Sequence, residues 1–433
     1  METKYVQGIR QNLPQFSQQL LQVFFVGLTI GMQRTVVPAL AESEFGVPAD
    51  SATLLMAFVV SFGFVKGSMN FVSGRVSERV GRRRVLIWGW LFALPIPFIF
   101  LLAPSWNWII AGNVLLGINQ GFTWSMTVTS KLDIVRPEQR GLATGFNEFA
   151  GYGGVALAGV ITSYLAVGFD PRSSLFVFGL TVVSLALISA LLFSADTLPW
   201  ARAESAAHKE GTHEGPRPRF PKNVSERPST SEIFMLVSFR HRTFMALSQA
   251  GCIEKFVDAL VWAFFPAYLY ARGLSLVEIG WVVGFYGFVW GGSQLWTGPL
   301  SDAIGRKWPI VIGMWICAAG VAATLLVEGV VAWSVTAAVT GVGMALLYPT
   351  LIAAVGDISH PDWRGSSLGV YRFWRDLGYG IGALLLGFIA DAFGALESGF
   401  WFTAIAMALS GLWVAIAMDE TLARLNCADN SED

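Results

Sequence analysis

The feature that most restricts the fold of this chain is a short hydrophilic motif that occurs twice. The second copy reads TGPLSDAIGRK and contains Gly298, Asp302, Gly305, Arg306 and Lys307. The first copy reads SGRVSERVGRRR and contains Gly74, Glu78, Gly81, Arg82 and Arg83. Each copy lies between two long apolar runs, and equivalent positions are 224 residues apart, as with Gly74 and Gly298.

The same offset continues on both sides of the motif. It pairs Asp133 with Asp357 and Arg140 with Arg364. It also pairs glycines, namely Gly63 with Gly287, Gly67 with Gly291, Gly141 with Gly365, and Gly145 with Gly369. A constant offset across several elements indicates an internal duplication. The chain therefore consists of two copies of one half.

This pattern resembles the signature loop of the major facilitator superfamily of secondary transporters. In that family the loop joins the second and third helices of each half and reads roughly Gly-x-x-x-Asp-(Arg)-x-Gly-Arg-(Arg/Lys). The second copy matches in full, whereas the first has Glu78 in place of the usual Asp. The resemblance extends over about residues 15–420. It implies a transporter fold and does not indicate a substrate.

Composition predicts a membrane protein, because 54% of the residues are hydrophobic and only 14% are charged. A membrane-spanning helix needs about 20 mostly apolar residues. Twelve runs meet this need, near 18–41, 50–73, 85–103, 108–132, 142–167, 174–194, 243–270, 277–297, 308–327, 330–355, 365–391 and 398–418. In lipid every backbone polar group needs an internal partner. We therefore expect an all-α membrane protein with 12 transmembrane helices in two pseudo-symmetric six-helix bundles.

These runs predict four parts of the chain. They are an N-terminal six-helix bundle at 1–194, a cytoplasmic central loop at 195–240, a C-terminal six-helix bundle at 241–420 and a cytoplasmic tail at 421–433. Within the central loop, Ser229 and Glu232 form a capping-box pattern that predicts a short helix. No small-residue cleavage signal accompanies the first run, so we expect a retained helix rather than a signal peptide.

The distribution of Lys and Arg predicts the orientation. If the N-terminus is inside, the outer loops hold only Arg172 and Arg272, and the inner loops hold almost all the other loop cations. We therefore expect a multi-pass protein of the cell (plasma or inner) membrane with both termini cytoplasmic. A net charge of −1 indicates no nucleic-acid partner. We expect a monomer that interacts with the bilayer and a small-molecule substrate.

The sequence shows no pattern of a catalytic or metal site. Cys252, Cys317 and Cys427 have no paired spacing, and the four histidines fall in predicted inner loops. No Ser/His/Asp constellation or phosphate-binding loop is visible. We therefore expect no enzyme activity, no cofactor and no metal.

The signature loops are candidates for gating. In the superfamily, the charged residues of the loop pair with the ends of neighbouring helices and hold the inward-closed state. Asp133 and Asp357 are here the predicted partners of Arg82 and Arg306. A tight Gly turn and a positive-inside anchor would explain the same residues, so both interpretations stay open.

Ionisable side chains inside a bilayer are costly and usually mark a functional site. The candidates for substrate binding or coupling are Arg34, Lys66, Asn113, Gln120, Trp124, Glu148, Glu254, Asp258, Arg372, Arg375 and Asp376. At about 100° per residue, most of them fall on polar faces of the fourth, seventh and eleventh helices. The offset pairs Arg34 with Asp258 and Glu148 with Arg372, so each half presents one cation and one anion at matched places.

Two structural interpretations compete with a functional one. Arg372 and Asp376 are four residues apart and form a possible self-neutralised pair. Lys66 and Lys131 lie near predicted cytoplasmic ends, where long cationic side chains can reach the interface.

The embedded arginines favour a solute with a carboxylate or another anionic group. Glu148, Glu254 and Asp258 are candidate proton-coupling acids. The sequence thus predicts an alternating-access symporter or antiporter of a small polar, anionic solute, coupled to protons. One alternative is proton-driven efflux of lipophilic or cationic drugs, and a more remote one is a membrane receptor that transports nothing. The fifth helix lacks the Gly-Pro motif of the best-known drug antiporters, and Asn113 stands where they often carry Arg.

Overall fold

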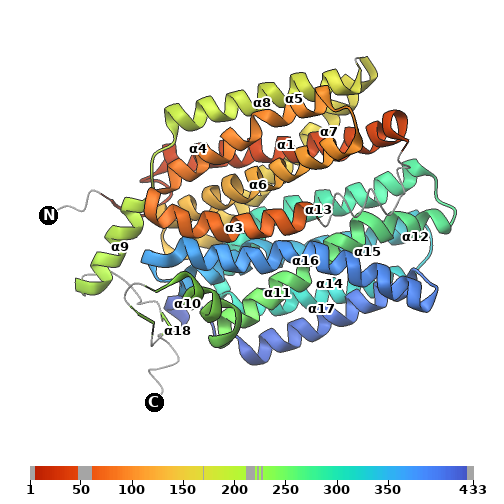
Figure 1. The fold of residues 1–433 in the computed structure, drawn as a ribbon. Coiled ribbons are helices and arrows are strands. Elements are labelled where there is room, and N and C mark those ends of the chain that lie inside the picture. Colours follow the sequence, from red (N-terminus) through yellow and green to blue (C-terminus); the bar gives the residue numbers. More distant parts are fainter. Residues whose placement is uncertain are drawn as a thin grey trace. The chain divides into compact units, whose positions relative to one another are not determined.

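The computed structural model describes residues 5–46, 61–168, 170–210, 220–221, 224–225 and 228–426. Within these ranges the chain forms helices and no strand, as predicted (Figure 1). The side chain of Arg34 lies outside the described part. Its pairing with Asp258 therefore stays a prediction.

Contacts between residues divide the chain into two compact units. Unit 1 consists of Met1–Arg136, Phe146–Thr212 and Pro361–Gly369, and unit 2 consists of Pro137–Gly145, His213–His360 and Val370–Asp433. Each unit thus contains most of one repeat and a short segment from the sequence of the other repeat.

Unit 1 is built from the apolar runs of the first repeat. Its helices are α1 (Leu13–Phe45), α3 (Ser61–Val80), α4 (Arg82–Ala93), α5 (Pro95–Leu102), α6 (Trp106–Ile134), most of α7 (Arg140–Gly168), α8 (Pro171–Phe193), α9 (Leu198–Glu210) and the short η5 (Pro361–Trp363). Helices α1 and α7 pack closely at Gly27. A Cβ added there would lie only 1.9 Å from the Gly151 carbonyl oxygen. Small residues allow such close approach of membrane helices.

Unit 2 is built from the runs of the second repeat. Its elements are η2 (Pro137–Gln139), α10 (Thr230–Met235), η3 (Leu236–Arg240), α11 (Arg242–Ala259), η4 (Leu260–Phe264), α12 (Phe265–Ala271), α13 (Leu276–Ile304), α14 (Lys307–Thr324), α15 (Val330–Ile358), most of α16 (Arg364–Phe393), α17 (Glu397–Ala417) and α18 (Ala423–Asn426). Helices α11 and α16 pack closely at Gly378, where an added Cβ would lie 2.3 Å from the Cys252 carbonyl oxygen.

Two predicted runs are each divided by a proline. The run at 85–103 becomes α4 and α5, which meet at Leu94 and Pro95. The run at 243–270 becomes α11 and α12, joined by a π-helical turn at Leu260–Phe264 just before Pro266. Proline lacks the N–H group that would continue the helical hydrogen bonds, and π-turns often lie near functional sites.

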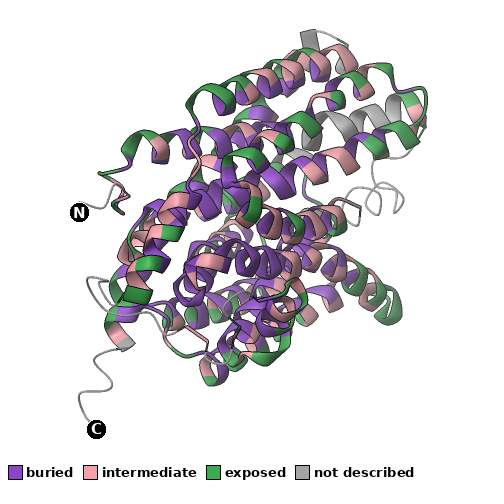
Figure 2. Ribbon diagram, turned by 60° about the vertical axis from the view of Figure 1, so that its left-hand side comes forward, coloured by how far each residue is buried: buried purple, intermediate pink, exposed green. Residues whose placement is uncertain are grey.

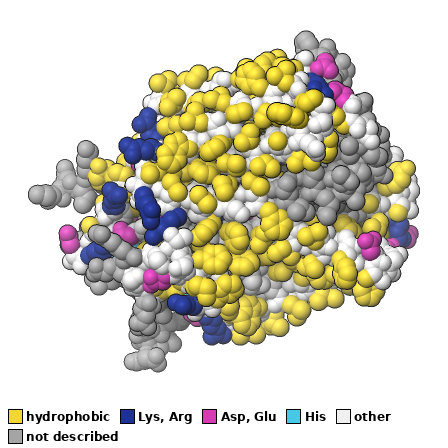
Figure 3. Space-filling view, viewed as in Figure 1, with side chains coloured by type: hydrophobic (Ala, Val, Ile, Leu, Met, Phe, Trp, Pro, Cys, Tyr) yellow, Lys and Arg dark blue, Asp and Glu magenta, His cyan; other side chains and the backbone are white. Residues whose placement is uncertain are grey.

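Six segments of the described helices are long and apolar enough to cross a membrane. They are Arg82–Leu102, Arg172–Phe193, Lys307–Thr324, Val330–Ile358, Pro361–Phe393 and Glu397–Ala417. Helices α6 and α11 are not among them, because both carry many polar side chains that the fold buries. Many turns alternate between buried and exposed residues in Figure 2. In Figure 3 hydrophobic side chains cover most of the visible surface of the helices, and Lys and Arg gather toward their ends.

The segment between the two repeats contains the predicted short helix. Ser229 caps α10 by accepting a hydrogen bond from the Glu232 N–H at 3.1 Å, and Glu232 accepts one from the Ser229 N–H at 3.4 Å. The capping box is therefore confirmed. The helix α9, which lies in the predicted central loop, was not expected from the sequence.

Candidate functional site

Both signature loops turn at a glycine that the geometry requires. Gly81 and Gly305 have φ of 96° and 98°, values that side chains with a Cβ rarely adopt. A Cβ would also lie 1.7 Å from Asp196 Oδ2 at Gly81, and 2.4 Å from Glu420 Oε2 at Gly305. The turn thus lets a carboxylate approach the start of the next helix.

In unit 2, Asp302 caps the first turn of α7. Its Oδ1 accepts a hydrogen bond from the Gly141 N–H at 2.8 Å, and its Oδ2 accepts one from the Leu142 N–H at 2.7 Å. The positive end of the helix dipole favours a carboxylate at this place. Oδ1 also lies 2.7 Å from Arg306 Nη1.

Arg306 is fully buried within this network. Its Nε lies 3.0 Å from Asp357 Oδ2, and its Nη1 donates to Ser301 Oγ at 2.8 Å. Glu420 accepts a hydrogen bond from the Arg306 backbone N–H at 2.9 Å. Burial acts to lower the pKa of Arg306, but the carboxylates of Asp357 and Asp302 outweigh burial and raise this pKa above its ordinary value. The guanidinium therefore stays charged.

Two buried arginines share Asp357. Its Oδ1 lies 3.0 Å from Arg140 Nη1, which also donates to the Gly356 carbonyl oxygen at 3.1 Å. Arg140 thus connects the start of α7 to the end of α15 inside unit 2.

Unit 1 repeats this network with its own residues. Arg82 Nε lies 3.1 Å from Asp133 Oδ2, and Arg82 Nη1 donates to Ser77 Oγ at 3.0 Å. Arg364, the counterpart of Arg140, places Nη1 3.4 Å from Asp133 Oδ1. The ion pairs that the sequence predicts for Arg82 and Arg306 are therefore both present.

The two networks differ at the acid of the signature motif. Glu78 Oε1 accepts a hydrogen bond from the Ser366 N–H at 2.6 Å, while Oε2 pairs with Arg75 Nη1 at 3.0 Å. Both carboxylate oxygens of Asp302 instead accept hydrogen bonds from backbone N–H groups of α7. The longer Glu side chain thus divides its oxygens between the helix and a neighbouring arginine.

Sequence reasoning missed three acids of these networks. Asp196 Oδ1 accepts a hydrogen bond from the Arg82 N–H at 3.0 Å, as Glu420 does from Arg306. Asp196-Thr197 and Glu420-Thr421 obey the 224-residue offset, so the repeat itself carried this signal. Glu204 of α9 lies 2.7 Å from Arg364 Nη2 and gives no such signal, because α9 was not expected.

The remaining basic residues of the motif lie beside these networks. Arg83 Nη2 donates to the Leu191 carbonyl oxygen at 2.6 Å. The Lys307 backbone N–H donates to Glu420 Oε2 at 3.1 Å. The motif glycines Gly74 and Gly298 face Gly365 and Gly141, where an added Cβ would lie 2.2 Å and 2.3 Å from a carbonyl oxygen.

A second polar cluster fills the interior of unit 2. Lys255 Nζ lies 2.6 Å from Asp258 Oδ2 and 3.2 Å from Glu254 Oε1, and all three side chains are fully buried. Asp258 also accepts hydrogen bonds from the Tyr379 hydroxyl at 3.0 Å and the Tyr286 hydroxyl at 3.4 Å. Asp258 is thus held by one cation and two phenols.

Helix α16 contributes the other charges of this cluster. Arg375 Nε lies 3.5 Å from Glu254 Oε2, and its guanidinium stands 3.5 Å from the centre of the Tyr348 ring. Lys255 Nζ lies 4.3 Å from the centre of the same ring. Arg372 and Asp376 are also buried. The structure therefore brings together Glu254, Asp258 and Arg375, which the sequence placed on two separate helices.

Unit 1 has a different interior, arranged around Glu148. Glu148 Oε1 accepts hydrogen bonds from Trp124 Nε1 at 3.0 Å and from Asn147 Nδ2 at 2.8 Å. Lys66 Nζ lies 5.2 Å from the centre of the Trp124 ring, a cation–π distance. Gln120 Nε2 donates to Thr29 Oγ1 of α1 at 3.1 Å.

The lysines do not reach an interface. Lys66 is 7% exposed and Lys131 is 1% exposed, so the snorkelling interpretation is wrong for both. Lys131 Nζ instead donates to the Gln19 carbonyl oxygen at 3.1 Å inside unit 1. Among the described residues, no group of three or more His, Cys, Asp or Glu side chains is placed to hold a metal ion.

Comparison with known proteins now identifies the family. The model of the Major Facilitator Superfamily matches residues 20–253 and again residues 247–426. The chain belongs to the major facilitator superfamily. Each repeat thus gives its own match, as expected from the duplicated signature loop.

Curated relatives are other transporters of the superfamily. The chain is 23% identical over 392 residues to an uncharacterised MFS-type transporter of Salmonella typhimurium, covering 86% of this chain and 88% of that protein. It is 24% identical over 416 residues to one of Burkholderia mallei, covering 93% and 91%. The chain is therefore a multi-pass membrane protein and a secondary transporter.

Solved structures share the fold of this transporter at low sequence identity. A human organic anion transporter, TETRAN, matches with a TM-score of 0.76 at 14% identity, covering 93% of this chain and 99% of that chain. A proton:xylose symporter, XylE, matches with a TM-score of 0.75 at 15% identity, covering 96% and 99%. These likenesses confirm the all-helical transporter fold and carry no substrate assignment.

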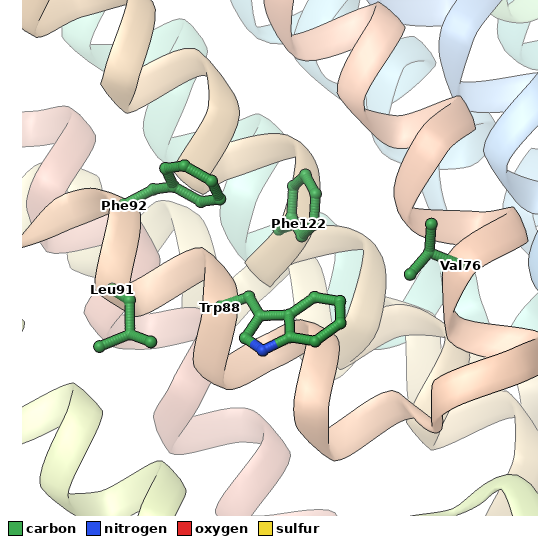
Figure 4. A pocket seen from close by; sticks show the side chains of 5 residues that line it. All are labelled: Val76, Trp88, Leu91, Phe92 and Phe122. Carbon is green, nitrogen blue, oxygen red and sulfur yellow. The ribbon is translucent and has the colours of Figure 1, made fainter.

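An apolar pocket of about 430 Å³ lies in unit 1, lined by side chains of α3, α4 and α6 (Figure 4). Its lining residues are Val76, Trp88, Leu91, Phe92 and Phe122. Trp88, Leu91 and Phe92 are 39%, 47% and 43% exposed. In a membrane protein such a surface faces lipid, so this pocket is not the candidate site for a polar solute.

Proposed function

We propose that this transporter moves a small polar solute with an anionic group, coupled to protons, by alternating access. The observation that carries the proposal is the buried charged face of unit 2. It combines three cations with three acids, namely Lys255, Arg372 and Arg375 with Glu254, Asp258 and Asp376. So many buried charges are costly for stability, which favours a functional explanation.

Charge balance gives this face a way to couple an anion to a proton. While Glu254, Asp258 and Asp376 are all ionised, they balance the three cations. The face is then neutral and has no net attraction for an anion. When one acid takes up a proton, the face gains one net positive charge. An incoming carboxylate then restores neutrality and can bind a guanidinium through two hydrogen bonds.

The candidates for the coupling proton are Glu148 of unit 1 and Glu254 and Asp258 of unit 2, and variants can distinguish them. Glu148→Gln and Asp258→Asn each remove one titrating group while keeping the shape of the side chain. We expect at least one of them to abolish accumulation driven by a pH gradient in proteoliposomes. If both variants accumulate solute like the wild type, Glu148 and Asp258 are not coupling acids, and Glu254→Gln becomes the decisive variant.

The signature-loop networks would act as latches in the same cycle. Asp302 and Glu78 each cap the first turn of a helix from the other repeat. A transport cycle that separates these segments must break such hydrogen bonds, which stabilises the state that contains them. We assign these ends to the cytoplasmic side of the cell membrane, as the distribution of Arg and Lys favours.

Ligand-induced thermal stabilisation tests the solute class. Detergent-purified protein and its Arg372→Ala variant would be melted with small organic anions, amino acids, sugars and lipophilic cations. A ligand at about 100 times its Kd stabilises the folded state by about 2.7 kcal/mol. We expect anions to stabilise the wild type and to lose this effect in the variant. Stabilisation by lipophilic cations that does not depend on Arg372 would contradict the proposal and indicate drug efflux.

A further inference from the structure

We infer that the apolar pocket of unit 1 holds an acyl chain of an anionic phospholipid, and that Arg79 and Arg84 hold the phosphate of that lipid. This lipid is distinct from the transported solute, so the inference does not depend on the proposed function.

Three helices of unit 1 form the pocket. Trp88, Leu91 and Phe92 line it from α4, and Val76 lines it from α3 (Figure 4). Phe122 of α6 lines it as well, and the centre of its ring lies 5.9 Å from that of Phe92. The volume of about 430 Å³ is within the range of about 300–1,000 Å³ that is usual for ligand pockets. All five side chains are apolar, so the pocket suits hydrocarbon rather than a polar group.

Close packing of α4 on α6 shapes the pocket. A Cβ added to Gly89 of α4 would lie 2.6 Å from Thr123 Cγ2 and 2.8 Å from Phe122 Cβ. Glycine therefore lets the backbone of α4 approach α6 between the positions of Trp88 and Phe92. The pocket is thus a product of how these helices pack.

Two exposed arginines lie at one end of the pocket. On α4, Arg84 precedes Trp88 by four residues, and on α3, Arg79 follows Val76 by three. Residues with these spacings share one helical face. Because the turn at Gly81 joins the end of α3 to the start of α4, both arginines belong to the same end of the helices. At 1.5 Å per residue, Arg84 is about 6 Å from Trp88 along the helix axis.

These two arginines are available for an anion. Neither forms an ion pair with a residue in the part of the chain that the structure describes. Glu78, which is next to Arg79 in the sequence, pairs with Arg75 instead. A guanidinium binds a phosphate through two hydrogen bonds, and basic pockets between membrane helices bind anionic lipid head groups.

The arginines that precede Arg84 have other partners. Arg82 pairs with Asp133 inside unit 1, and Arg83 donates to the Leu191 carbonyl oxygen of α8. Three consecutive arginines are thus directed to three different places, and only Arg84 shares the face of Trp88.

The second repeat shows that the turn does not require these two arginines. The 224-residue offset places Ala303 at the position of Arg79 and Trp308 at that of Arg84. Both equivalent residues of unit 2 are exposed, so they fit the same ends of the helices without a charge. An anchor of positive charge at the membrane surface would explain the arginines of unit 1, but it would not explain an apolar pocket one turn away.

The test measures contact between a lipid chain and Trp88, because brominated acyl chains quench tryptophan fluorescence when they touch the indole. Full-length protein would be reconstituted in phosphatidylcholine vesicles that contain brominated phosphatidylglycerol or brominated phosphatidylcholine with identical chains. The signal of Trp88 is the difference between each protein and the same protein with Trp88→Phe. The variants are Arg79→Ala and Arg84→Gln, and the matched control is Arg240→Gln, which removes one exposed cation of unit 2.

We expect brominated phosphatidylglycerol to quench Trp88 half-maximally at an about 25-fold lower mole fraction than brominated phosphatidylcholine. Each arginine near an anionic lipid contributes about fivefold. Each single variant should therefore reduce this preference about fivefold, and the double variant should abolish it. Arg240→Gln should keep the preference of the wild type. Because both substituted positions are exposed, either variant that reconstitutes decides the test.

Four outcomes would overturn the inference. The first is equal quenching of Trp88 by the two brominated lipids, and the second is an absence of quenching that depends on Trp88. The third is a preference for phosphatidylglycerol that survives both arginine variants. The fourth is an equal loss of preference in Arg240→Gln, which would indicate attraction to the charged surface as a whole.

Discussion

The two units match at the ends that carry the signature loops and differ in the interior of their helices. At the ends, Arg82, Asp133 and Arg364 of unit 1 repeat Arg306, Asp357 and Arg140 of unit 2. In the interior, unit 2 holds charged side chains bound to one another, whereas unit 1 holds amides and one carboxylate with free oxygens. Duplication thus kept the ion pairs at the ends of the helices and let the interiors diverge.

One pair of positions shows how the interiors diverged. Trp124 and Tyr348 are equivalent in the repeat, and each lies beside a lysine at a cation–π distance. The lysine of unit 1 is Lys66 of α3, whereas that of unit 2 is Lys255 of α11. The same ring position is therefore kept, while the charge reaches it from a different helix.

The largest effect should come from breaking the shared carboxylates. Asp133→Asn and Asp357→Asn each remove a carboxylate that two buried arginines share, although Arg364 keeps its pair with Glu204 and Arg306 keeps its pair with Asp302. Breaking a buried ion pair costs about 3–5 kcal/mol. If the two ends are equivalent, both variants should lower the free energy of unfolding by similar amounts in a denaturant titration. Glu397→Gln, which removes an exposed partner of Arg272, is the control and should change stability little. A stable Asp357→Asn protein would refute the latch.

A smaller effect should distinguish the two interiors. Trp124→Phe keeps an aromatic ring and removes the hydrogen bond to Glu148, which leaves a buried carboxylate with one donor fewer. We expect a loss of about 1–3 kcal/mol, measured by thermal or chemical unfolding. Tyr348→Leu removes the ring beside Arg375 and Lys255, with an expected loss of about 2 kcal/mol. Restoration of stability by Glu148→Gln in the Trp124→Phe background would confirm the assignment to the carboxylate.

The smallest effect concerns the acid of the signature motif, which is Glu78 in unit 1 and Asp302 in unit 2. Glu78→Asp makes the first signature motif match the second and allows both oxygens to cap the helix that begins near Ser366. We expect a gain of about 0.3–1 kcal/mol, the usual value of a carboxylate at a helix N-terminus. Asp302→Glu should cause a loss of similar size. If the two substitutions change stability in the same direction, the pattern of capping is not the reason for the difference.

The sequence predicted the fold because its signals were local and repeated. Apolar runs of membrane length and the duplicated motif predicted the helices, and the resemblance to the superfamily predicted the partners of Arg82 and Arg306. Two details of the fold were not predicted. Two runs that we expected to form continuous helices are each divided at a proline, and α9 lies in a segment that we expected to be a polar linker. The prediction of a capping box at Ser229 was correct because that motif depends on only four consecutive residues.

The interior of each unit was harder to predict, since it depends on contacts between helices. Helical spacing placed Glu254 and Asp258 on one face, but it did not show that Lys255 binds both. Nor did it show that Tyr286, Tyr348 and Tyr379 complete that cluster. Burial of Lys66 and Lys131 also depends on neighbouring helices, which is why an interfacial location was a reasonable expectation and was wrong.

Uptake into proteoliposomes tests the central claim most directly, that the buried cations of unit 2 hold the anionic group of the solute. The probe is the radiolabelled anion that gives the largest thermal stabilisation, supplied under an inwardly and, in parallel, an outwardly directed proton gradient. The wild type should accumulate it, and Arg375→Ala should not, while the exposed-residue control Arg240→Gln should behave like the wild type. Accumulation by Arg375→Ala at the wild-type rate would contradict the account.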